Sequence, residues 1–405
     1  MKYITFIPLI GGMAIANEQA TGKKPEFVLS YDAFEKNESN LKDYWPDVKW
    51  YILNSETNDL QENEVLDYSD IDFVSSVCPC AGMSMMSSTR SADSETNNWL
   101  YKAADYILGT IKPKVYFGEN APGLYAASNE KVLNKLKEYG QKYGYSFTIY
   151  KTDTRLHGIP QRRVRTFFFF WKGDKCPIMD YYDNQSEKPF EEWILDKNVG
   201  THNEIELNRC PSLEFASFKY IYSTKCEGDY NKYVEFFKNI NIERRITNAM
   251  DYICINDEWS KFIDWLKTDE IGNKSISNTG KRTHLSLAEY RLNKIQNGLR
   301  FYCDEPILYF GYTGAVTGKI VSLMLHPKEM RYLTQREAMA LMGLPEDFKV
   351  TSGNIAHITQ NVPVCTARDM TNQAIKFING ELELTDYNFI KQNNLNRKIE
   401  LKIKS

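Results

Sequence analysis

The fold class that this sequence predicts is α/β, with a largely parallel sheet. Two observations predict it. Through about residue 171, short apolar runs alternate with polar stretches of helical periodicity, which is the pattern of successive βα units. After Gly173 this alternation stops, and order returns only from Arg331. The sequence therefore predicts an α/β domain that is interrupted by a region of different composition.

Seven short apolar segments are expected to form the strands, because polar or turn-forming residues bound each of them. They are Tyr3–Ile7, Phe27–Tyr31, Trp50–Leu53, Phe73–Val77, Val115–Phe117, Ser146–Lys151 and Thr166–Trp171. We interpret the apolar N-terminal run as the first strand and its turn rather than as a signal sequence. It is short, and it leads through Pro8 into Gly11-Gly12.

Helices are expected between these strands, where apolar residues recur three and four positions apart. They are Gly12–Thr21, Asn97–Thr110 and Glu130–Tyr143. Further along, Thr334 and Glu337 have the spacing of a capping box and predict a helix over Glu337–Met342. A last helix is expected over about residues 364–378, and the charged, Asn-rich residues 381–405 are expected to be a peripheral tail.

The composition limits the class of protein. With 405 residues, of which 42% are hydrophobic, the chain has enough apolar side chains for a sizeable core. The formal net charge of −3 counts mildly against a nucleic-acid-binding protein, although a local basic face is compatible with it. The eight cysteines form neither a disulfide framework nor a metal-ligand pattern, which indicates a reducing compartment and no metal site. No apolar run is long enough to span a membrane.

Chemically active residue types stand next to the predicted strands. Pro79-Cys80 and Glu119-Asn120 each follow a strand, and Gln161-Arg162-Arg163-Val164-Arg165 leads into another. Strand ends are where open α/β sheets bind ligands. A thiol and a carboxylic acid, with Arg163 and Arg165 on one face of a strand, are suited to covalent attack on a polar ring. Each motif alone has an ordinary explanation, such as a buried cysteine or a helix-capping acid, and their order argues against it.

With these motifs in this order, the chain resembles the DNA (cytosine-5)-methyltransferase family. The resemblance is strongest over Leu156–Arg165 and Arg331–Phe348, and it includes Pro79-Cys80 and Glu119-Asn120. It implies a Rossmann-like S-adenosylmethionine-dependent methyltransferase domain with a smaller inserted target-recognition domain. The implied boundaries are 1–173 for the catalytic and cofactor-binding domain, 174–330 for the target-recognition domain, 331–380 for the return segment that completes the catalytic domain, and 381–405 for the C-terminal tail.

The resemblance implies a role for each catalytic residue. Cys80 would add to C6 of a cytosine, so that C5 becomes electron-rich and takes the methyl group. Glu119 would hold or protonate N3 and the exocyclic amine. Arg165 would contact O2 of the base, with Arg163 beside it near the thiolate or a phosphate. Because the reacting edge is hidden in duplex DNA, the target base would be flipped out of the stack.

The resemblance also implies S-adenosylmethionine as the cofactor. The residues expected to bind it are Ile7, Leu9, Gly11, Gly12, Asp32, Asp59, Leu60, Pro79, Leu100, Asn361 and Val362. Among them, Asp32 would accept the ribose hydroxyls and Asp59 would bind the adenine amino group. The chain departs from the family at Leu9, where a glycine is usual, and at Thr359-Gln360, where Gly-Asn is usual. These departures bear on cofactor affinity and on the donor more than on the nucleophilic step.

Double-stranded DNA is the expected partner. Residues 174–330 would supply most contacts, and the polar loop Met83–Asn98 resembles the family's mobile loop that closes over the flipped base. The residues expected at the DNA are Ser84, Arg90, Gln161, Arg244, Arg245, Lys281, Arg282 and Lys319. Taken one at a time, the basic residues of the middle region are explained at least as well as solvated loop residues.

Three hypotheses stay open at this point. The first is a monomeric DNA cytosine-5 methyltransferase of a bacterium or virus, cytoplasmic and nucleoid-associated, in a restriction-modification or host-evasion system. The second is an RNA cytosine-5 methyltransferase, which uses the same chemistry. The third is a catalytically reduced DNA-binding relative, which Leu9 and Thr359-Gln360 favour and the retained Cys80 and Glu119 oppose.

Overall fold

The computed structural model describes residues 1–62, 64–79, 83, 91–208, 259–275, 283–297, 309, 311–316, 324, 326–329, 331–350 and 355–402. The chain forms two compact units. The first comprises Met1–Pro189, Tyr312–Gly318 and Met339–Ser405, and the second comprises Phe190–Gly311 and Lys319–Ala338. Three separate stretches of chain therefore build the first unit.

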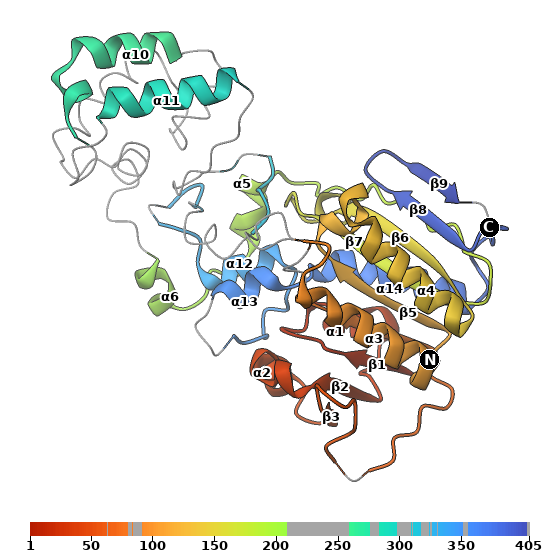
Figure 1. Cartoon of the computed structure of the whole chain (residues 1–405). Helices are drawn as coiled ribbons and strands as arrows, with labels where there is room; N and C mark the ends of the chain where they lie inside the picture. The colour runs from red at the N-terminus through yellow and green to blue at the C-terminus, as the bar shows by residue number, and fades with distance from the viewer. Residues whose placement is uncertain are drawn as a thin grey trace. The chain divides into compact units, whose positions relative to one another are not determined.

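A mixed α/β sheet organises the first unit (Figure 1). Its strands are β1 Tyr3–Phe6, β2 Phe27–Tyr31, β3 Trp50–Leu53, β4 Phe73–Val77, β5 Val115–Asn120, β6 Tyr145–Asp153, β7 Val164–Lys172, β8 Phe389–Asn393 and β9 Lys398–Lys402. Their order is β3-β2-β1-β4-β5-β7-β6-β8-β9. The strands from β1 to β5 run parallel, whereas β7 is antiparallel to both β5 and β6. The predicted α/β class and all seven predicted strands are confirmed.

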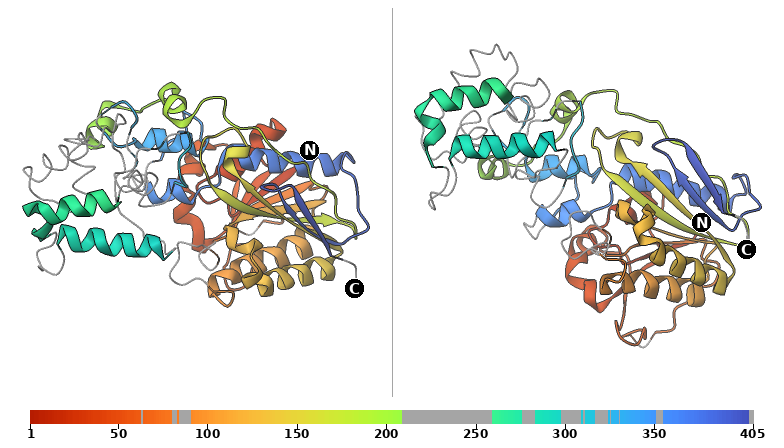
Figure 2. Two further views of the ribbon diagram at one scale, coloured as in Figure 1. Left: turned by 90° about the horizontal axis from the view of Figure 1, so that it is seen from above. Right: turned by 45° about the horizontal axis from the view of Figure 1, so that its top comes forward.

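Helices cover both faces of this sheet (Figure 2). In the first unit they are α1 Gly12–Thr21, α2 Glu35–Tyr44, α3 Asn98–Tyr106, α4 Glu130–Tyr143, α13 Ile355–Gln360 and α14 Val364–Ile378. The alternation of side chains along β7 separates the two faces. The ring of Trp171 packs 4.9 Å from that of Phe377 of α14, whereas Phe170 points the other way, against Gly140 of α4. Both layers are therefore apolar on the side that meets the sheet.

The helices α1 and α4 have the predicted bounds, whereas α2 and α3 differ from the sequence analysis. The helix expected over Asn97–Thr110 is α3, which continues as a π-helical turn over Ile107–Ile111. The helix α2 follows directly from a short 3-10 turn and was not expected, because its sequence is polar apart from Leu41 and Tyr44. Tertiary contacts rather than periodicity therefore hold α2 in place.

A buried polar network fixes α1 to the sheet and to α14. Asn17 of α1 donates to Ser75 Oγ of β4 over 2.6 Å, and it accepts a hydrogen bond from Thr371 Oγ1 of α14 over 2.8 Å. Because buried polar groups are costly when unsatisfied, these bonds restrict the orientation of α1. The helix N-terminus, which follows the turn after β1, is thereby positioned at the carboxyl edge of the sheet.

The C-terminal residues are part of this sheet, which differs from the peripheral tail that we expected. The strand β8 pairs parallel with β6, and β9 pairs antiparallel with β8. Phe389 and Ile390 of β8 are buried. The side chain of Gln392 accepts from Met179 N and donates to Met179 O. The edge of the sheet is β9, where Lys398 is exposed, whereas β8 is paired on both sides and buried through Gln392.

The described helices of the second unit are α5 Phe190–Trp193, α6 His202–Leu207, α10 Trp259–Thr268 and α11 His284–Gln296. The helix α12, Gln335–Leu341, begins in this unit. The predicted capping box is confirmed, because Glu337 N donates to Thr334 Oγ1 and Thr334 N donates to Glu337 Oε2. No helix in the described part of the chain has the length and apolar character needed to cross a membrane.

Candidate active site

Glu119 and Arg165 form an ion pair at the carboxyl end of β5. Because β7 runs antiparallel to β5, the start of β7 lies beside the end of β5. This brings Arg165 Nε to 2.6 Å from Glu119 Oε1. Glu119 is buried, which raises the pKa of its carboxyl group, and the charges of Arg165 and Arg163 oppose that rise. The strand order thus joins two residues that the sequence separates by 46 positions (165 − 119).

Arg163 is buried near this pair. It lies directly before β7, two residues before Arg165. Its guanidinium group donates to the carbonyl oxygens of Val316 at 2.8 Å, Thr359 at 2.8 Å and Asn361 at 3.0 Å. Its exposed fraction is 2%. Arg163 therefore ties the β6–β7 hairpin to two distant segments, while its positive charge acts on Glu119.

Gln161, which we expected at the DNA, has internal partners instead. Its side chain is completely buried. The amide nitrogen donates to Leu341 O over 2.6 Å, and the amide oxygen accepts from Val316 N over 3.3 Å. A third bond joins the same two segments, since the backbone N–H of Thr313 donates to Pro160 O. These contacts give Gln161 a positioning role for the segment 312–316.

The predicted nucleophile Cys80 lies outside the described residues, directly after Pro79 in the sequence. Ser84, Arg90, Arg244, Arg245, Lys281, Arg282 and Lys319 also lie outside them. Cys78 is described, and it is buried with its pKa raised to about 12 by desolvation. A thiol in that environment stays protonated at neutral pH, so Cys78 is not a suitable nucleophile.

Burial has the same effect on the other described cysteines. It raises the pKa of Cys176 to about 11 and that of Cys365 to about 12. None of the three described cysteines therefore has the activated thiol that nucleophilic attack requires.

The turn after β1 has an unusual backbone. Ile7 and Leu9 adopt positive φ angles of 48° and 51°, and Gly11 adopts 113°. Positive φ is rare for any residue but glycine, and most of all for a β-branched one. Gly12 has ordinary φ, but a Cβ there would lie 2.2 Å from Val362 O. The turn is buried except at Leu9, which is partly exposed, and the N–H groups of Ile7, Gly11 and Gly12 have internal acceptors.

The turn is fastened to the segment that precedes α14. Gly12 N donates to Asn361 Oδ1 over 2.8 Å in a buried contact. Asn361 and Val362 are themselves buried. The structure therefore places Gly12 next to Asn361 and Val362, three residues that the sequence analysis expected at the cofactor.

Asp32 stands at the carboxyl end of β2, one strand away from the turn. Ser55 N donates to Asp32 Oδ1 over 3.2 Å. Hydrogen bonds from Ser55 lower the pKa of Asp32, with a smaller contribution from the charge of Lys102. The carboxylate is thus ionised and suited to accept hydroxyl donors.

Lys102 is a residue that we missed. Its ammonium group donates to Ser55 O and lies 5.3 Å from the ring centroid of Tyr31 and 5.9 Å from that of Trp99. In the sequence it is one polar residue within an amphipathic helix, where a solvated position is the ordinary expectation. Only its place beside Asp32 distinguishes it.

The remaining predicted cofactor residues differ in exposure. Asp59 is exposed, and Leu60 and Pro79 are partly exposed. Leu100 has no exposed surface and belongs to the core between the sheet and α3. Leu100 is therefore a core residue and has no accessible surface with which to contact a ligand.

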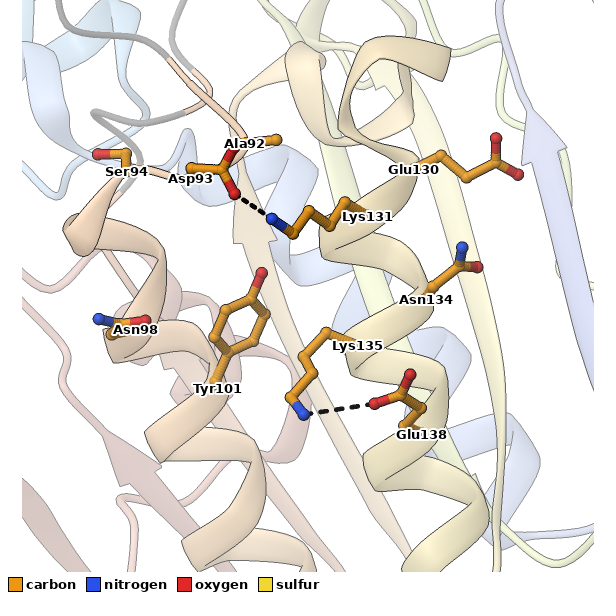
Figure 3. Close-up of a pocket in the computed structure, with 10 residues that line it drawn as sticks. All are labelled: Ala92, Asp93, Ser94, Asn98, Tyr101, Glu130, Lys131, Asn134, Lys135 and Glu138. Carbon is orange, nitrogen blue, oxygen red and sulfur yellow. Dashed lines mark hydrogen bonds and ion pairs between the residues drawn. The ribbon is translucent and has the colours of Figure 1, made fainter.

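The structure also has a surface pocket of about 770 Å³ between α3 and α4 (Figure 3). Asp93 pairs with Lys131 across it, and Tyr101 faces it from α3. None of the predicted site residues lines it. Among the described residues there is also no group of three or more His, Cys, Asp or Glu side chains that could hold a metal ion.

Sequence and fold are both similar to those of known methyltransferases. The profile of the family described as C-5 cytosine-specific DNA methylase matches residues 1–376. The chain is 25% identical over 445 residues to the type II methyltransferase M.BanI of Aneurinibacillus aneurinilyticus, covering 95% of this chain and 99% of that protein. It is 30% identical over 112 residues to the type II methyltransferase M.Bpa9945I of Bacillus paralicheniformis, and this match spans 25% of each chain. Its fold resembles the crystal structure of a DNA modification methyltransferase encoded within an E. coli prophage, with a TM-score of 0.54, 14% identity and coverage of 94% of this chain and 100% of that one.

Proposed function

Since the chain belongs to the C-5 cytosine-specific DNA methylase family, we propose that it transfers a methyl group from S-adenosylmethionine to C5 of a flipped-out cytosine in duplex DNA. The observation that supports this most is the buried Glu119–Arg165 pair, with Arg163 beside it, at the end of β5. The strand β4, which leads to Pro79-Cys80, pairs with β5, and Val77 is in register with Glu119.

Cys80 is the proposed nucleophile. Its thiolate forms a bond to C6 of the cytosine, and the electron pair of the C5–C6 double bond moves onto C5. After C5 has been methylated, a base removes the C5 proton, the C5–C6 double bond forms again and the thiolate leaves. The buried state of Cys78 supports the choice between the two neighbouring cysteines.

Glu119 is proposed to act on N3 and the exocyclic amine. Burial favours the protonated form of its carboxyl group, so the group can donate a hydrogen bond or a proton to N3 as negative charge develops in the ring. Arg165 orients this carboxyl group and carries a charge suited to O2 of the base. Arg163 adds positive charge from a fixed position, because three carbonyl groups hold it.

The chain's residues fit S-adenosylmethionine, which supplies the methyl group as a sulfonium when bound. The strained turn Ile7–Gly11 follows β1 at the carboxyl edge of the sheet, where open α/β folds bind ligands, and the close approach of Gly12 to Asn361 and Val362 closes one side of the region. Asp32 offers an ionised acceptor for ribose hydroxyls, and Asp59 is exposed and accessible to an adenine amino group. Lys102 holds the loop of Ser55 that donates to Asp32.

Duplex DNA is the proposed substrate and a type II restriction-modification system the proposed setting, because M.BanI and M.Bpa9945I are type II methyltransferases. We further propose that the protein acts as a cytoplasmic monomer in a bacterial or virus-infected cell. An RNA cytosine substrate is the second candidate, since the proposed chemistry is the same on either nucleic acid.

Covalent trapping tests the function directly. With S-adenosylmethionine, duplex DNA that contains 5-fluorocytosine is expected to remain bonded to the protein in a denaturing gel, because fluorine replaces the C5 proton that a base must remove before the thiolate can leave. Cys80→Ala should abolish both the adduct and methyl transfer to ordinary DNA, whereas Cys78→Ala, the matched control, should retain both.

Each other outcome rejects one hypothesis. Methyl label that appears in RNA but not in duplex DNA would reject the DNA substrate. Tight DNA binding with no label and no adduct would identify a DNA-binding protein without transferase activity. An adduct that persists in Cys80→Ala would remove Cys80 as the nucleophile.

A further inference from the structure

The carboxylate of Asp153 is buried at the end of β6 and has no part in the mechanism above. Its side chain is 1% exposed. One oxygen, Oδ1, accepts from Arg155 N over 3.1 Å and from Arg163 N over 3.2 Å. The other, Oδ2, accepts from Arg155 Nε over 3.3 Å and from Arg155 Nη2 over 3.0 Å. A single buried side chain therefore joins the residues after β6 to the residue before β7.

Arg163 depends on this contact because it lies just outside the paired strands. The last paired residues of the β6–β7 hairpin are Asp153 and Val164, so Arg163 is one residue beyond them. Its carbonyl group accepts from Thr154 N over 3.1 Å and from Thr154 Oγ1 over 3.3 Å. Its N–H donates to Asp153 Oδ1. Asp153 and Thr154 therefore hold the main chain of Arg163 on both sides.

The main chain of Arg163 bears on two parts of the site. Two residues later, Arg165 Nε lies 2.6 Å from Glu119 Oε1. The guanidinium group of Arg163 donates to Asn361 O, and the side chain of Asn361 accepts from Gly12 N at the start of α1. Displacement of Arg163 would therefore disturb the catalytic ion pair and the turn together. Reaction rates fall steeply when reacting groups are displaced by about 1 Å.

Asp153 also makes contacts that are ordinary for a turn. It caps the 3-10 turn Thr154–Leu156 by accepting from Arg155 N. It pairs with the Arg155 side chain, which is one-third exposed and lies 4.4 Å from the ring centroid of Tyr312. Neither the cap nor the ion pair needs the bond from Arg163 N. That third contact is what connects Asp153 to the catalytic residues.

We propose that Asp153 is a positioning residue for the two arginines: its Oδ1 atom holds the main chain of Arg163 and thereby sets the direction in which Arg163 and Arg165 meet Glu119. This inference rests on the proposed function, because it assigns these residues to methyl transfer. The property required is a hydrogen-bond acceptor rather than a negative charge, since the partner is a neutral backbone N–H.

Three substitutions separate these roles of Asp153. Asp153→Ala removes every acceptor and leaves a buried N–H of Arg163 without a partner. Asp153→Asn keeps a carbonyl oxygen of the same reach but carries no charge. Asp153→Ser keeps an oxygen that can cap the turn, but it is one bond shorter and does not reach Arg163 N. Asp183→Ala removes an exposed aspartate and is the matched control.

The single-turnover rate of methyl transfer to duplex DNA, at saturating DNA and S-adenosylmethionine, tests the proposal. Asp153→Ala and Asp153→Ser should lower this rate roughly tenfold or more, because the arginines are no longer aligned. DNA affinity, measured separately, should change by less than about threefold. Asp153→Asn should restore the rate to within about threefold of the wild type, and Asp183→Ala should leave it unchanged.

The pH dependence of the rate is a readout that a loss of stability alone would not change. Burial raises the pKa of Glu119, and the charges of Arg165 and Arg163 oppose that rise. With protonated Glu119 as the proton donor, the rate falls as pH rises through this pKa. Displaced arginines oppose the rise less, so the falling limb should move to higher pH in Asp153→Ala and Asp153→Ser. In Asp153→Asn it should stay in place.

Asp153→Ser covers the case in which Asp153→Ala does not fold, because it keeps the cap, and thermal melting reports whether it folds. An equal loss of rate in Asp153→Asn and Asp153→Ser would show that the charge matters and would overturn the proposal. A wild-type rate with an unmoved limb in Asp153→Ser would overturn it as well, while leaving the methyl-transfer function intact. Absence of methyl transfer by the wild-type protein would overturn the proposed function and this inference with it.

Discussion

Glu119 shows how position changes the protonation chemistry of an ordinary side chain. In water its carboxyl group would be ionised at neutral pH. At the end of β5 it is buried, which favours the neutral form, and Arg165 fixes its direction without being able to accept its proton. Two opposing effects, desolvation and ion pairing, thus hold one acid in a state in which it can give and take a proton.

Glu119→Gln should separate proton transfer from binding. The carboxamide keeps the size of the side chain and can still contact Arg165, but it cannot donate the proton that N3 needs. We expect a fall of roughly 10²–10⁴ in the single-turnover rate of methyl transfer. The affinity for S-adenosylmethionine should stay within about threefold of the wild type, which a binding titration would measure.

Glu130→Gln, at an exposed acid on α4, is the control and should leave the rate unchanged. If Glu119→Gln retained a rate close to that of the wild type, the proton-transfer role would be wrong.

At the scale of elements, the start of α1 packs directly against Asn361 and Val362, the residues that precede α14. The helix α1 is held from both sides, by the Asn17 network along its length and by the bond from Gly12 to Asn361 at its N-terminus. Glycine at position 12 is required here for space rather than for backbone freedom.

Gly12→Ala should therefore be strongly destabilising, although alanine is the better helix former. The new Cβ would lie 2.2 Å from Val362 O and 2.3 Å from Asn361 Oδ1, so the backbone of one segment must move. We expect a loss of about 2 kcal/mol or more in the free energy of unfolding, measured by chemical denaturation.

Gln19→Ala, at an exposed position of the same helix, should change stability by less than about 0.5 kcal/mol and serves as the control. Equal stability of the two variants would show that the contact between α1 and the segment before α14 is looser than the structure indicates.

At the scale of the whole molecule, the first unit depends on chain segments from both ends of the sequence. Residues 1–189 supply seven of the strands, Val316 bonds to both Gln161 and Arg163, and the C-terminal stretch supplies α14, β8 and β9. Without β8, the backbone groups of β6 would have no partner on that side, which leaves an open sheet edge.

Deletion of residues 386–405 should therefore destabilise the protein rather than remove a dispensable tail. Burial of Phe389 and Ile390 contributes about 1.5–3 kcal/mol each, and the exposed edge of β6 favours association between molecules. We expect a loss of roughly 3 kcal/mol or more in unfolding free energy, with aggregation visible by light scattering. A control that lacks only residues 403–405 should behave as the full chain does. A deletion variant that melted like the full chain and stayed monomeric would show that the hairpin is peripheral after all.

The sequence predicted the strands, three of the helices and the capping box well, because each depends on local signals. Apolar runs, helical periodicity and the Thr334–Glu337 spacing act over a few residues, and the structure agrees. It gave no signal for α2 or for Asp153, since an isolated polar helix and a buried acid both lack a local pattern. Gln161 had the right residue type for DNA contact, but its partners at Leu341 and Val316 lie far away in the chain.

By itself, then, the sequence determined the α/β class, the family and the order of the chemical motifs, since these follow from residue type and short-range spacing. The tertiary structure decided what surrounds each side chain. It placed β7 antiparallel beside β5, which joins Glu119 to Arg165, and it buried Cys78, Gln161 and Asp153. The physical reason is that charge state and hydrogen bonding depend on burial and on neighbours across the sheet, which pairing between distant segments creates.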